Sequence, residues 1–328
     1  MDLNKIMESI ADVIDQKPSF TMWFVFKDGE KIDIKLANIV STEKNQKSDQ
    51  MQISKVFIDK LKDMCNTVDA MSLRKISDLV AEKDSIFEYD YEYDESPQIV
   101  KMFYDMNIES IDKYQNFNFH KQDISKLFAY VFYLGTMEQG IFLYKQHYPV
   151  SLIKRGNRII RIIDDTRMEF YESDDLIRIS SDFHLLKVKN KIYVTDISVL
   201  EKKLGFNEII TNHANRTIDL IEEIGVLEEI DVLRDELSNM RIVRKLANMK
   251  ESSPVFQNHI SAGELINFSK TNQSLIGRFK YSADGKRFLL TTKKSKEDFI
   301  KLLNDDFLLS ELTGKRYEAI GKDAIEND

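Results

Sequence analysis

Positively charged side chains gather in two short stretches of this sequence. The first stretch supplies Lys154, Arg155, Arg158 and Arg161, and the second supplies Lys280, Lys286, Arg287, Lys293 and Lys294. Cations on turns and at helix starts suit contacts with phosphate, which provide most sequence-independent affinity for nucleic acid. These residues are therefore the candidates for a DNA-binding surface. The alternative is a solvated surface of mixed charge, because the formal net charge is −8 and no known nucleic-acid-binding motif is present.

Carboxylates offer a second kind of chemistry. Metal-dependent nucleases hold a cation with carboxylates and place a lysine near the attacking water, and Asp196 followed by Glu201-Lys202-Lys203 is the nearest approach to that pattern. The same residues fit a helix-capping aspartate beside an ordinary exposed helix face. A metal-dependent nuclease or phosphodiesterase is the second hypothesis, with carboxylates drawn from Asp164, Asp165, Asp196, Glu201, Asp305 and Asp306. We assign no catalytic residue, metal ligand or cofactor.

The sequence lacks the motifs of common metal-binding, nucleotide-binding and serine-hydrolase sites. The five histidines are far apart in sequence, and none has a cysteine or a second histidine at metal-ligand spacing. The chain contains no Walker-type phosphate loop, no GxGxxG and no GxSxG. Nucleotide hydrolases, dinucleotide-binding enzymes and serine hydrolases therefore lose their usual sequence support.

An acidic row is the third charged feature. From Phe87 onwards, aromatic residues alternate with Glu88, Asp90, Glu92 and Asp94, which predicts a strand with one acidic face. This row is a candidate docking surface for a cationic partner. The alternative is a solvated strand face whose charges protect the strand against aggregation.

The elements that must position these groups are mainly hairpins and helices. Residues 20–36 alternate in polarity around Asp28-Gly29, and residues 183–195 form two apolar runs around Lys189-Asn190-Lys191, so both stretches predict β-hairpins. Asp196 can begin a helix that Gly205 ends. The sequence therefore predicts an α+β protein of β-hairpins and mixed sheets with packed helices.

The second basic stretch falls on a predicted hairpin and on the helix that follows it. The hairpin covers residues 275–291 and turns at Asp284-Gly285, and Ser295 with Asp298 begins the helix. A last helix is expected from Phe307 to Leu312. The hairpin turn would project its cations away from the core.

Composition is that of an ordinary globular protein, with 42% hydrophobic and 31% charged residues. The single cysteine cannot form an internal disulfide, and the N-terminus lacks the uninterrupted apolar core of a signal peptide. No window approaches the roughly twenty apolar residues of a membrane span. We therefore expect a cytoplasmic protein. Residues 270–322 contain 12 Lys and Arg against 7 Asp and Glu, a local excess that suits an anionic ligand.

Three short motifs stand out near the C-terminus, together with the blocks RIIRIIDD and FHLLKVKNKIYVTDISVLEKKLGF. They are Leu303-Asn304-Asp305-Asp306, Ser310-Glu311-Leu312-Thr313 and Tyr317-Glu318-Ala319. Through these residues the part of the chain from about residue 150 to residue 322 resembles the KwaB-like proteins of the bacterial Kiwa anti-phage defence system. We therefore expect two parts, an N-terminal α+β region of residues 1–120 and a KwaB-like C-terminal domain of residues 121–328.

The resemblance implies a function and partners. KwaB-like proteins form dimers, associate at the inner membrane with the multi-spanning protein KwaA, and bind DNA so as to obstruct phage replication and late transcription. The family supplies no catalytic residues to carry over. For this chain the resemblance implies a homodimer, recruitment to the inner membrane through a KwaA-like partner without direct insertion, and DNA binding. The apolar helical run of residues 206–246 also favours a dimer, because it offers more apolar faces than one layer covers.

Overall fold

A computed structural model describes residues 2–37, 46–78, 84–118, 121–148, 159–164, 167–171, 182–309, 314 and 316–318. Only the backbone is described for residues 46–53, 159–164, 167–171, 251, 309, 316 and 318. The chain divides into two compact units. Unit 1 comprises Met1–Arg74, Glu82–Tyr89 and Gln98–Leu200, and unit 2 comprises Lys75–Ala81, Asp90–Pro97 and Glu201–Asp328. The boundary expected at residue 120 falls inside unit 1.

Unit 1 is built on an eight-stranded sheet with the order β2-β1-β5-β6-β9-β10-β4-β3. The strands are β1 (Ser19–Asp28), β2 (Lys31–Leu36), β3 (Ser72–Lys75), β4 (Ser85–Glu88), β5 (Leu127–Gly135), β6 (Gly140–Gln146), β9 (Leu185–Val188) and β10 (Lys191–Val194). The central ladders are antiparallel. The two predicted hairpins of this unit are confirmed as β1–β2 and β9–β10. Lys189 and Asn190 both have positive φ, which the tight turn between β9 and β10 requires.

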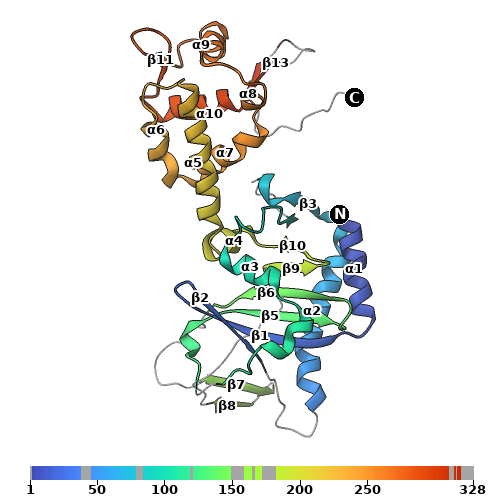
Figure 1. Cartoon of the computed structure of the whole chain (residues 1–328). Helices are drawn as coiled ribbons and strands as arrows, with labels where there is room; N and C mark the ends of the chain where they lie inside the picture. The colour runs from blue at the N-terminus through green and yellow to red at the C-terminus, as the bar shows by residue number, and fades with distance from the viewer. Residues whose placement is uncertain are drawn as a thin grey trace. The chain divides into compact units, whose positions relative to one another are not determined.

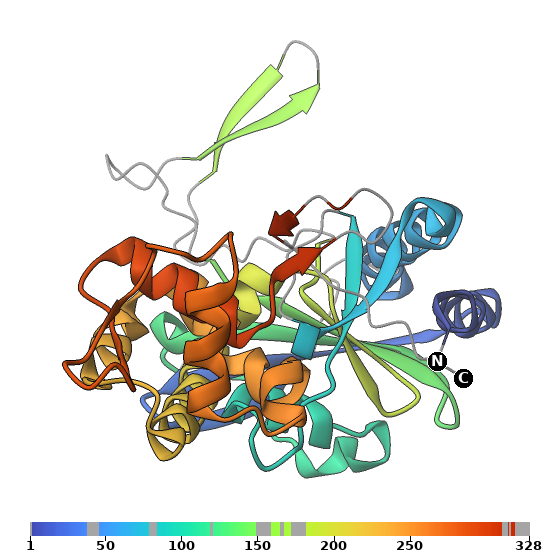
Figure 2. The same ribbon diagram turned by 90° about the horizontal axis from the view of Figure 1, so that it is seen from above.

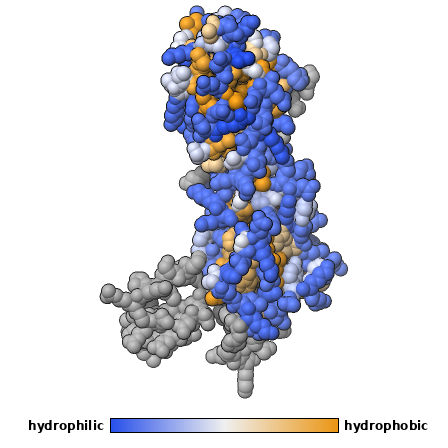
Figure 3. Space-filling view, turned by 60° about the vertical axis from the view of Figure 1, so that its left-hand side comes forward, coloured by the Kyte–Doolittle hydropathy of each residue, from blue (hydrophilic) through white to orange (hydrophobic). Residues whose placement is uncertain are grey.

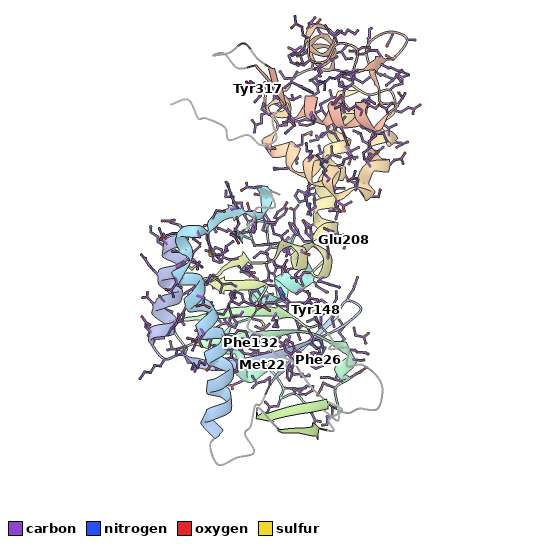
Figure 4. All side chains as sticks on the ribbon, turned by 180° about the vertical axis from the view of Figure 1, so that it is seen from behind. Met22, Phe26, Phe132, Tyr148, Glu208 and Tyr317 are labelled. Carbon is purple, nitrogen blue, oxygen red and sulfur yellow. The ribbon has the colours of Figure 1, made fainter. Side chains whose placement is uncertain are left out.

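Two helices, α1 (Leu3–Asp15) and α2 (Gln46–Asn66), cover one face of this sheet (Figure 1). Their apolar faces meet β1 and β5 in a core that includes Ile6, Ile10, Phe57 and Phe132. Figure 4 labels Met22, Phe26 and Phe132, three strand residues of this core. On the other face, Phe103 of α3 (Gln98–Asp105) packs edge-on against Tyr144 of β6. Both faces of the sheet are therefore covered, which explains the nearly continuous burial of β5 and β6.

Unit 2 is mainly helical. Its longer helices are α5 (Phe206–Ile224), α7 (Met240–Ser252), α9 (Ala262–Thr271) and α10 (Lys293–Leu303), with the short α6 (Asp231–Arg234) and α8 (Pro254–Gln257) between them. The helix α4 (Ile197–Lys203) precedes them and spans the division between the units. Two small hairpins complete the unit, β11–β12 (Lys280–Tyr281, Phe288–Leu289) and β13–β14 (Phe307–Leu309, Arg316–Glu318). Figure 2 shows unit 2 from above, with its C-terminal segments in orange and red.

A further hairpin, β7–β8 (Ile159–Asp164, Arg167–Tyr171), forms a separate two-stranded sheet. The α+β class expected from the sequence is confirmed. Within the described ranges, no helix combines the length and the apolar character that crossing a membrane requires.

One expected element is wrong in type, and two are shorter in the structure than the sequence predicts. The strand expected over residues 87–94 ends at Glu88, because only residues up to Tyr89 hydrogen-bond to β10. The helix expected from Phe307 is the strand β13, because residues 307–309 pair with residues 316–318. A short apolar run suits either a helix or a strand, and pairing decides between them. The hairpin expected over residues 275–291 is limited to 280–289, and a turn occupies residues 273–278.

Candidate nucleic-acid interface

The second basic stretch lies on β11–β12 and on the first turn of α10, both within unit 2. Phe288 of β12 anchors the hairpin, because its ring is fully buried and contacts Phe279 at 4.9 Å and Phe299 of α10 at 5.4 Å between centroids. The hairpin and α10 thus share one aromatic core. The lysines and the arginine of the second basic stretch remain exposed outside this core.

The helix α10 begins three residues earlier than the sequence indicates. Thr292 is its N-cap, and the side chains of Thr292 and Ser295 form a reciprocal capping box. Ser295 was expected to be the cap, and this expectation is wrong. The consequence is that Lys293 and Lys294 lie inside the first turn of α10 and that Asp298 lies in the second.

Two residues of α9, Lys270 and Ser269, hold the β11–β12 hairpin against α9. Lys270 donates a hydrogen bond from Nζ to the main-chain oxygen of Gly285 at 3.0 Å and lies 4.7 Å from the centroid of the Tyr281 ring. The hydroxyls of Ser269 and Tyr281 are 3.0 Å apart. The hairpin is thereby fixed to α9 at its turn and at β11.

Asp284 stabilises the same turn from within. Its carboxylate accepts hydrogen bonds from Ser282 Oγ at 2.6 Å and from the main-chain N–H of Lys286 at 3.0 Å. The hydrogen bond from Ser282 is the main reason that the pKa of Asp284 is lowered. Gly285 has a φ of +69°, which suits a residue without a Cβ. The tip that carries Lys286 is therefore ordered by local hydrogen bonds.

The five cations of this stretch are all exposed, but they are not equivalent. Lys294 Nζ lies 2.9 Å from Asp298 Oδ1, and Arg287 Nη1 lies 3.5 Å from Glu228 Oε2. Lys280, Lys286 and Lys293 form no ion pair in the described part of the chain, although the Asp284 carboxylate interacts electrostatically with Lys286 at the hairpin tip. These three lysines, which we call the unpaired lysines, are the ones that can approach a phosphate without first breaking an ion pair.

Asp298 is a functional candidate that sequence reasoning did not identify. Its side chain is completely buried, and Arg278 and Lys294 both approach its Oδ1. Its Oδ2 is also buried and has no hydrogen-bond partner among the described residues. Burying a carboxylate is costly unless cations or hydrogen-bond donors accompany it. The spacing of Lys294 and Asp298 at i and i+4 is the only signal that the sequence carries for this contact.

Most of the first basic stretch is not among the described residues. Lys154, Arg155 and Arg158 lie outside the described residues. Arg161 lies on β7, where its backbone pairs in register with that of Glu169 on β8. The structure therefore does not bring the two basic stretches together as one described surface.

The carboxylates of the nuclease hypothesis have other contacts. Glu201 is buried and accepts hydrogen bonds from Arg244, including Nε to Oε1 at 3.0 Å and Nη2 to Oε1 at 2.7 Å. Asp196 accepts a hydrogen bond from the main-chain N–H of Val199 at 3.2 Å, as a helix cap does. Asp306 is buried and accepts a hydrogen bond from Asn304 Nδ2 at 2.8 Å. Each of these three groups has a structural contact that accounts for it.

The remaining nuclease candidates add no cluster. Asp305 has a φ of +53° in the turn after α10, Asp164 is described only by its backbone on β7, and Asp165 lies outside the described residues. Across the ranges that the structure describes, no group of three or more His, Cys, Asp and Glu side chains is arranged to hold a metal ion.

The acidic row is divided by the structure. Glu88 lies on β4 and forms an ion pair with Lys191 of β10 in unit 1. Asp90 belongs to unit 2 and accepts hydrogen bonds from the main-chain N–H of Ser77, at 3.0 Å, and from its hydroxyl. Glu92 and Asp94 are exposed. The four carboxylates therefore do not form the single strand face that their alternation predicts.

Comparison with known proteins gives consistent results. The family model described as "Kiwa protein KwaB-like" matches residues 124–313. The chain is 23% identical to the Kiwa protein KwaB of Escherichia coli O55:H7 (strain RM12579 / EPEC), over 99% of this chain and 100% of that protein. No solved structure matches the chain.

Proposed function

This chain belongs to the KwaB-like family of Kiwa proteins, and from that premise we propose that it is a non-catalytic effector that binds duplex DNA through phosphate groups. Membership of this family supports a role in anti-phage defence. By binding without sequence preference, the protein obstructs the replication and late transcription of phage DNA.

The observation that carries the proposal is the set of unpaired lysines on β11–β12 and α10. Lys280, Lys286 and Lys293 are exposed on elements that share one aromatic core, although the chain as a whole is acidic. A cation that is not held in an ion pair can release a counterion from DNA at little cost. Arg287 and Lys294 add positive charge beside them, and the first basic stretch supplies a second contact surface. The main-chain N–H groups at the start of α10 add donors for phosphate.

The test is an incubation with plasmid and phage DNA in magnesium, in manganese and in EDTA. Retardation of both DNAs in all three conditions, without strand cleavage, is the expected result. Cleavage that requires magnesium or manganese would instead support the second function, a metal-dependent nuclease or phosphodiesterase. The contacts of Glu201 with Arg244 and of Asp196 with Val199 favour the non-catalytic proposal, because they give these carboxylates structural roles.

Two partners belong to the same proposal. The first is a second copy of the chain, and here the family resemblance is the main support, because Ile210, Ile218 and Ile221 of α5 are buried within unit 2 itself. Light scattering at micromolar concentration should give the mass of a dimer. A monomer mass would contradict the proposed dimer.

The second partner is a KwaA-like membrane protein that recruits the chain to the inner membrane from the cytoplasm. Glu88, Asp90, Glu92 and Asp94 are the candidate docking residues for its cationic cytoplasmic loops. Glu92 is exposed, whereas Glu88 and Asp90 have partners within the chain. Sedimentation with membranes only in cells that contain the partner is the expected result. Sedimentation without it would exclude this recruitment.

A further inference from the structure

An exposed isoleucine stands close in sequence to the unpaired lysines. Ile276 is 61% exposed, the largest value among the large apolar side chains that the structure describes, and Phe268 on α9 is 39% exposed. The space-filling view shows hydrophobic residues at the surface of unit 2, bordered by hydrophilic ones (Figure 3). Single exposed apolar residues are common on protein surfaces, so the surroundings of Ile276 decide what it means.

The turn that carries Ile276 is held firmly on both sides. Leu275 is completely buried, and Phe279 is buried against Phe288. The main-chain N–H of Ile276 donates to the oxygen of Asn272 at 3.1 Å, and the main-chain N–H of Arg278 donates to the oxygen of Leu275 at 3.0 Å. The isoleucine is therefore presented on an ordered turn, and inserting it into a partner would cost little conformational entropy.

The next residue leaves room for close approach. Gly277 has a φ of +80°, and no atom lies within 4 Å of the position that a Cβ would take there. Asn272 is itself nearly buried, and its side-chain oxygen accepts a hydrogen bond from the main-chain N–H of Ser274 at 2.9 Å, which closes the turn at its start. A partner can thus reach the backbone beside Ile276 without a side chain in the way.

The charged residues around Ile276 indicate which kind of partner it would contact. Lys280 follows Ile276 by four residues, and Arg278 between them is tied to Asp298 of α10 at 3.3 Å, which brings the turn to the helix that carries Lys293. Lysine is depleted in protein–protein interfaces. Proteins that kink duplex DNA combine cations with an apolar side chain that enters between two base steps. An exposed isoleucine on a turn that is tied to α10, with Lys280 four residues further along the chain, therefore fits a DNA duplex better than a protein surface.

We propose that Ile276 is an apolar wedge that enters the minor groove and kinks duplex DNA, while Lys280, Lys286 and Lys293 hold the flanking phosphates. This inference rests on the proposed DNA-binding function and adds to it a contact that phosphate binding alone does not need. The wedge requires no particular base sequence, since it acts by unstacking, and it gives a bound protein a way to distort the template.

The test compares Ile276→Ser with wild type in the full chain. We expect Ile276→Ser to weaken duplex binding roughly tenfold and to leave the salt dependence unchanged, because the isoleucine displaces no counterion. Fluorescence energy transfer between the ends of a short duplex should report a bend with wild type and none with the variant. Ile276→Met should keep both properties, because methionine also serves as a wedge.

A matched control is available in unit 1. Met137 is 59% exposed in the turn between β5 and β6, so Met137→Ser removes a comparable exposed apolar side chain far from this turn in sequence. It should change neither affinity nor bend. The same effect from both variants would overturn the wedge, as a general loss of surface hydrophobicity would then explain the result.

Other outcomes separate the two proposals. If wild type binds duplex DNA but Ile276→Ser keeps the affinity and the bend, the wedge is wrong and the proposed function stands. If Ile276→Ser instead changes the mass in light scattering, or abolishes binding to anionic phospholipid vesicles while DNA binding persists, the residue belongs to a protein or lipid interface. If wild type does not bind DNA, the proposed function itself fails.

Discussion

Lys294 Nζ lies 2.9 Å from Oδ1 of Asp298, one turn further along α10, whereas Lys293 next to it has no carboxylate partner in the described structure. Two adjacent lysines in the same turn of α10 therefore differ in their ion pairing. The charge of Lys294 compensates a buried carboxylate, and the charge of Lys293 is available to a ligand. Sequence alone treats these two residues as equal members of one basic stretch.

This difference gives the first prediction. Lys293→Gln should weaken duplex binding and lower the salt slope by about one unit, because one phosphate contact is lost. Lys294→Gln should lower the slope less and should reduce the free energy of unfolding by about 1 to 2 kcal/mol, because Asp298 loses one of its two cations. Salt titrations of binding and denaturant unfolding of both variants provide the measurement. Equal effects on DNA binding would contradict the assignment.

The second prediction concerns the hairpin tip. Reversing the charge of Lys286 and Arg287 to Glu should weaken binding equally on unrelated duplex sequences and flatten the salt slope, while the fold is retained because both side chains are exposed. Lys286→Glu alone should account for most of the change, since Arg287 already has Glu228 at 3.5 Å. An unchanged slope in the double variant, with the oligomer intact, would place the DNA surface elsewhere.

The third prediction separates a structural carboxylate from a catalytic one. Arg244→Ala leaves the buried carboxylate of Glu201 without its cation and should lower the free energy of unfolding by on the order of 3 kcal/mol. Replacing both residues, Glu201→Gln with Arg244→Met, should recover part of that loss. Neither variant should change DNA affinity when the folded fraction is taken into account. Loss of a metal-dependent cleavage activity in Glu201→Gln would support the nuclease hypothesis instead.

The fourth prediction is a pH dependence in unit 1. Lys187 of β9 is buried and donates hydrogen bonds to the main-chain oxygens of Tyr104 and of Met106, the latter at 2.8 Å. Burial lowers its pKa from 10.5 to about 8. Between these two pH values the unfolded chain holds a proton that the folded chain has lost. The free energy of unfolding contributed by this group therefore rises with pH in that window.

Urea unfolding at several pH values between 8 and 10.5, in wild type and in Lys187→Met, measures this contribution. The difference between the two proteins should shift in favour of wild type as the pH rises. Burial raises the pKa of Tyr130 and Tyr193, so both proteins should lose stability above about pH 10, and that common loss cancels in the difference. Identical pH profiles would show that Lys187 does not titrate in this range.

Local features of the fold could be predicted from the sequence because their causes lie within a few residues. Asp28-Gly29, Lys189-Asn190 and Asp284-Gly285 each mark a tight turn, and the structure has a positive φ at Gly29, at Lys189 and Asn190, and at Gly285. Ser261 and Glu264 form a reciprocal capping box, whose two partners lie only three residues apart in sequence. The resemblance to the KwaB-like family could also be recognised from the sequence, because it rests on the order of residues along the chain.

Elements whose type, helix or strand, depends on distant partners could not be predicted from the sequence in the same way. Residues 307–309 form a strand because residues 316–318 pair with them, and residues 90–94 leave the sheet although their alternation continues. The order of the eight strands, in which β9 and β10 insert between β6 and β4, requires contacts across more than fifty residues. Such pairings depend on which chain segments can bury surface together, and local periodicity does not contain that information.

The candidate site shows the same division. The sequence by itself determined where the cations are, and that the hairpin and the helix start would expose them. Only the tertiary structure decided which of these cations remain available, because Lys294 pairs with Asp298 and Arg287 pairs with Glu228. The tertiary structure also decided the role of Glu201, whose partner Arg244 lies 43 residues away in sequence. An ion pair is selected by burial and by distance in space, and both quantities exist only once the chain has folded.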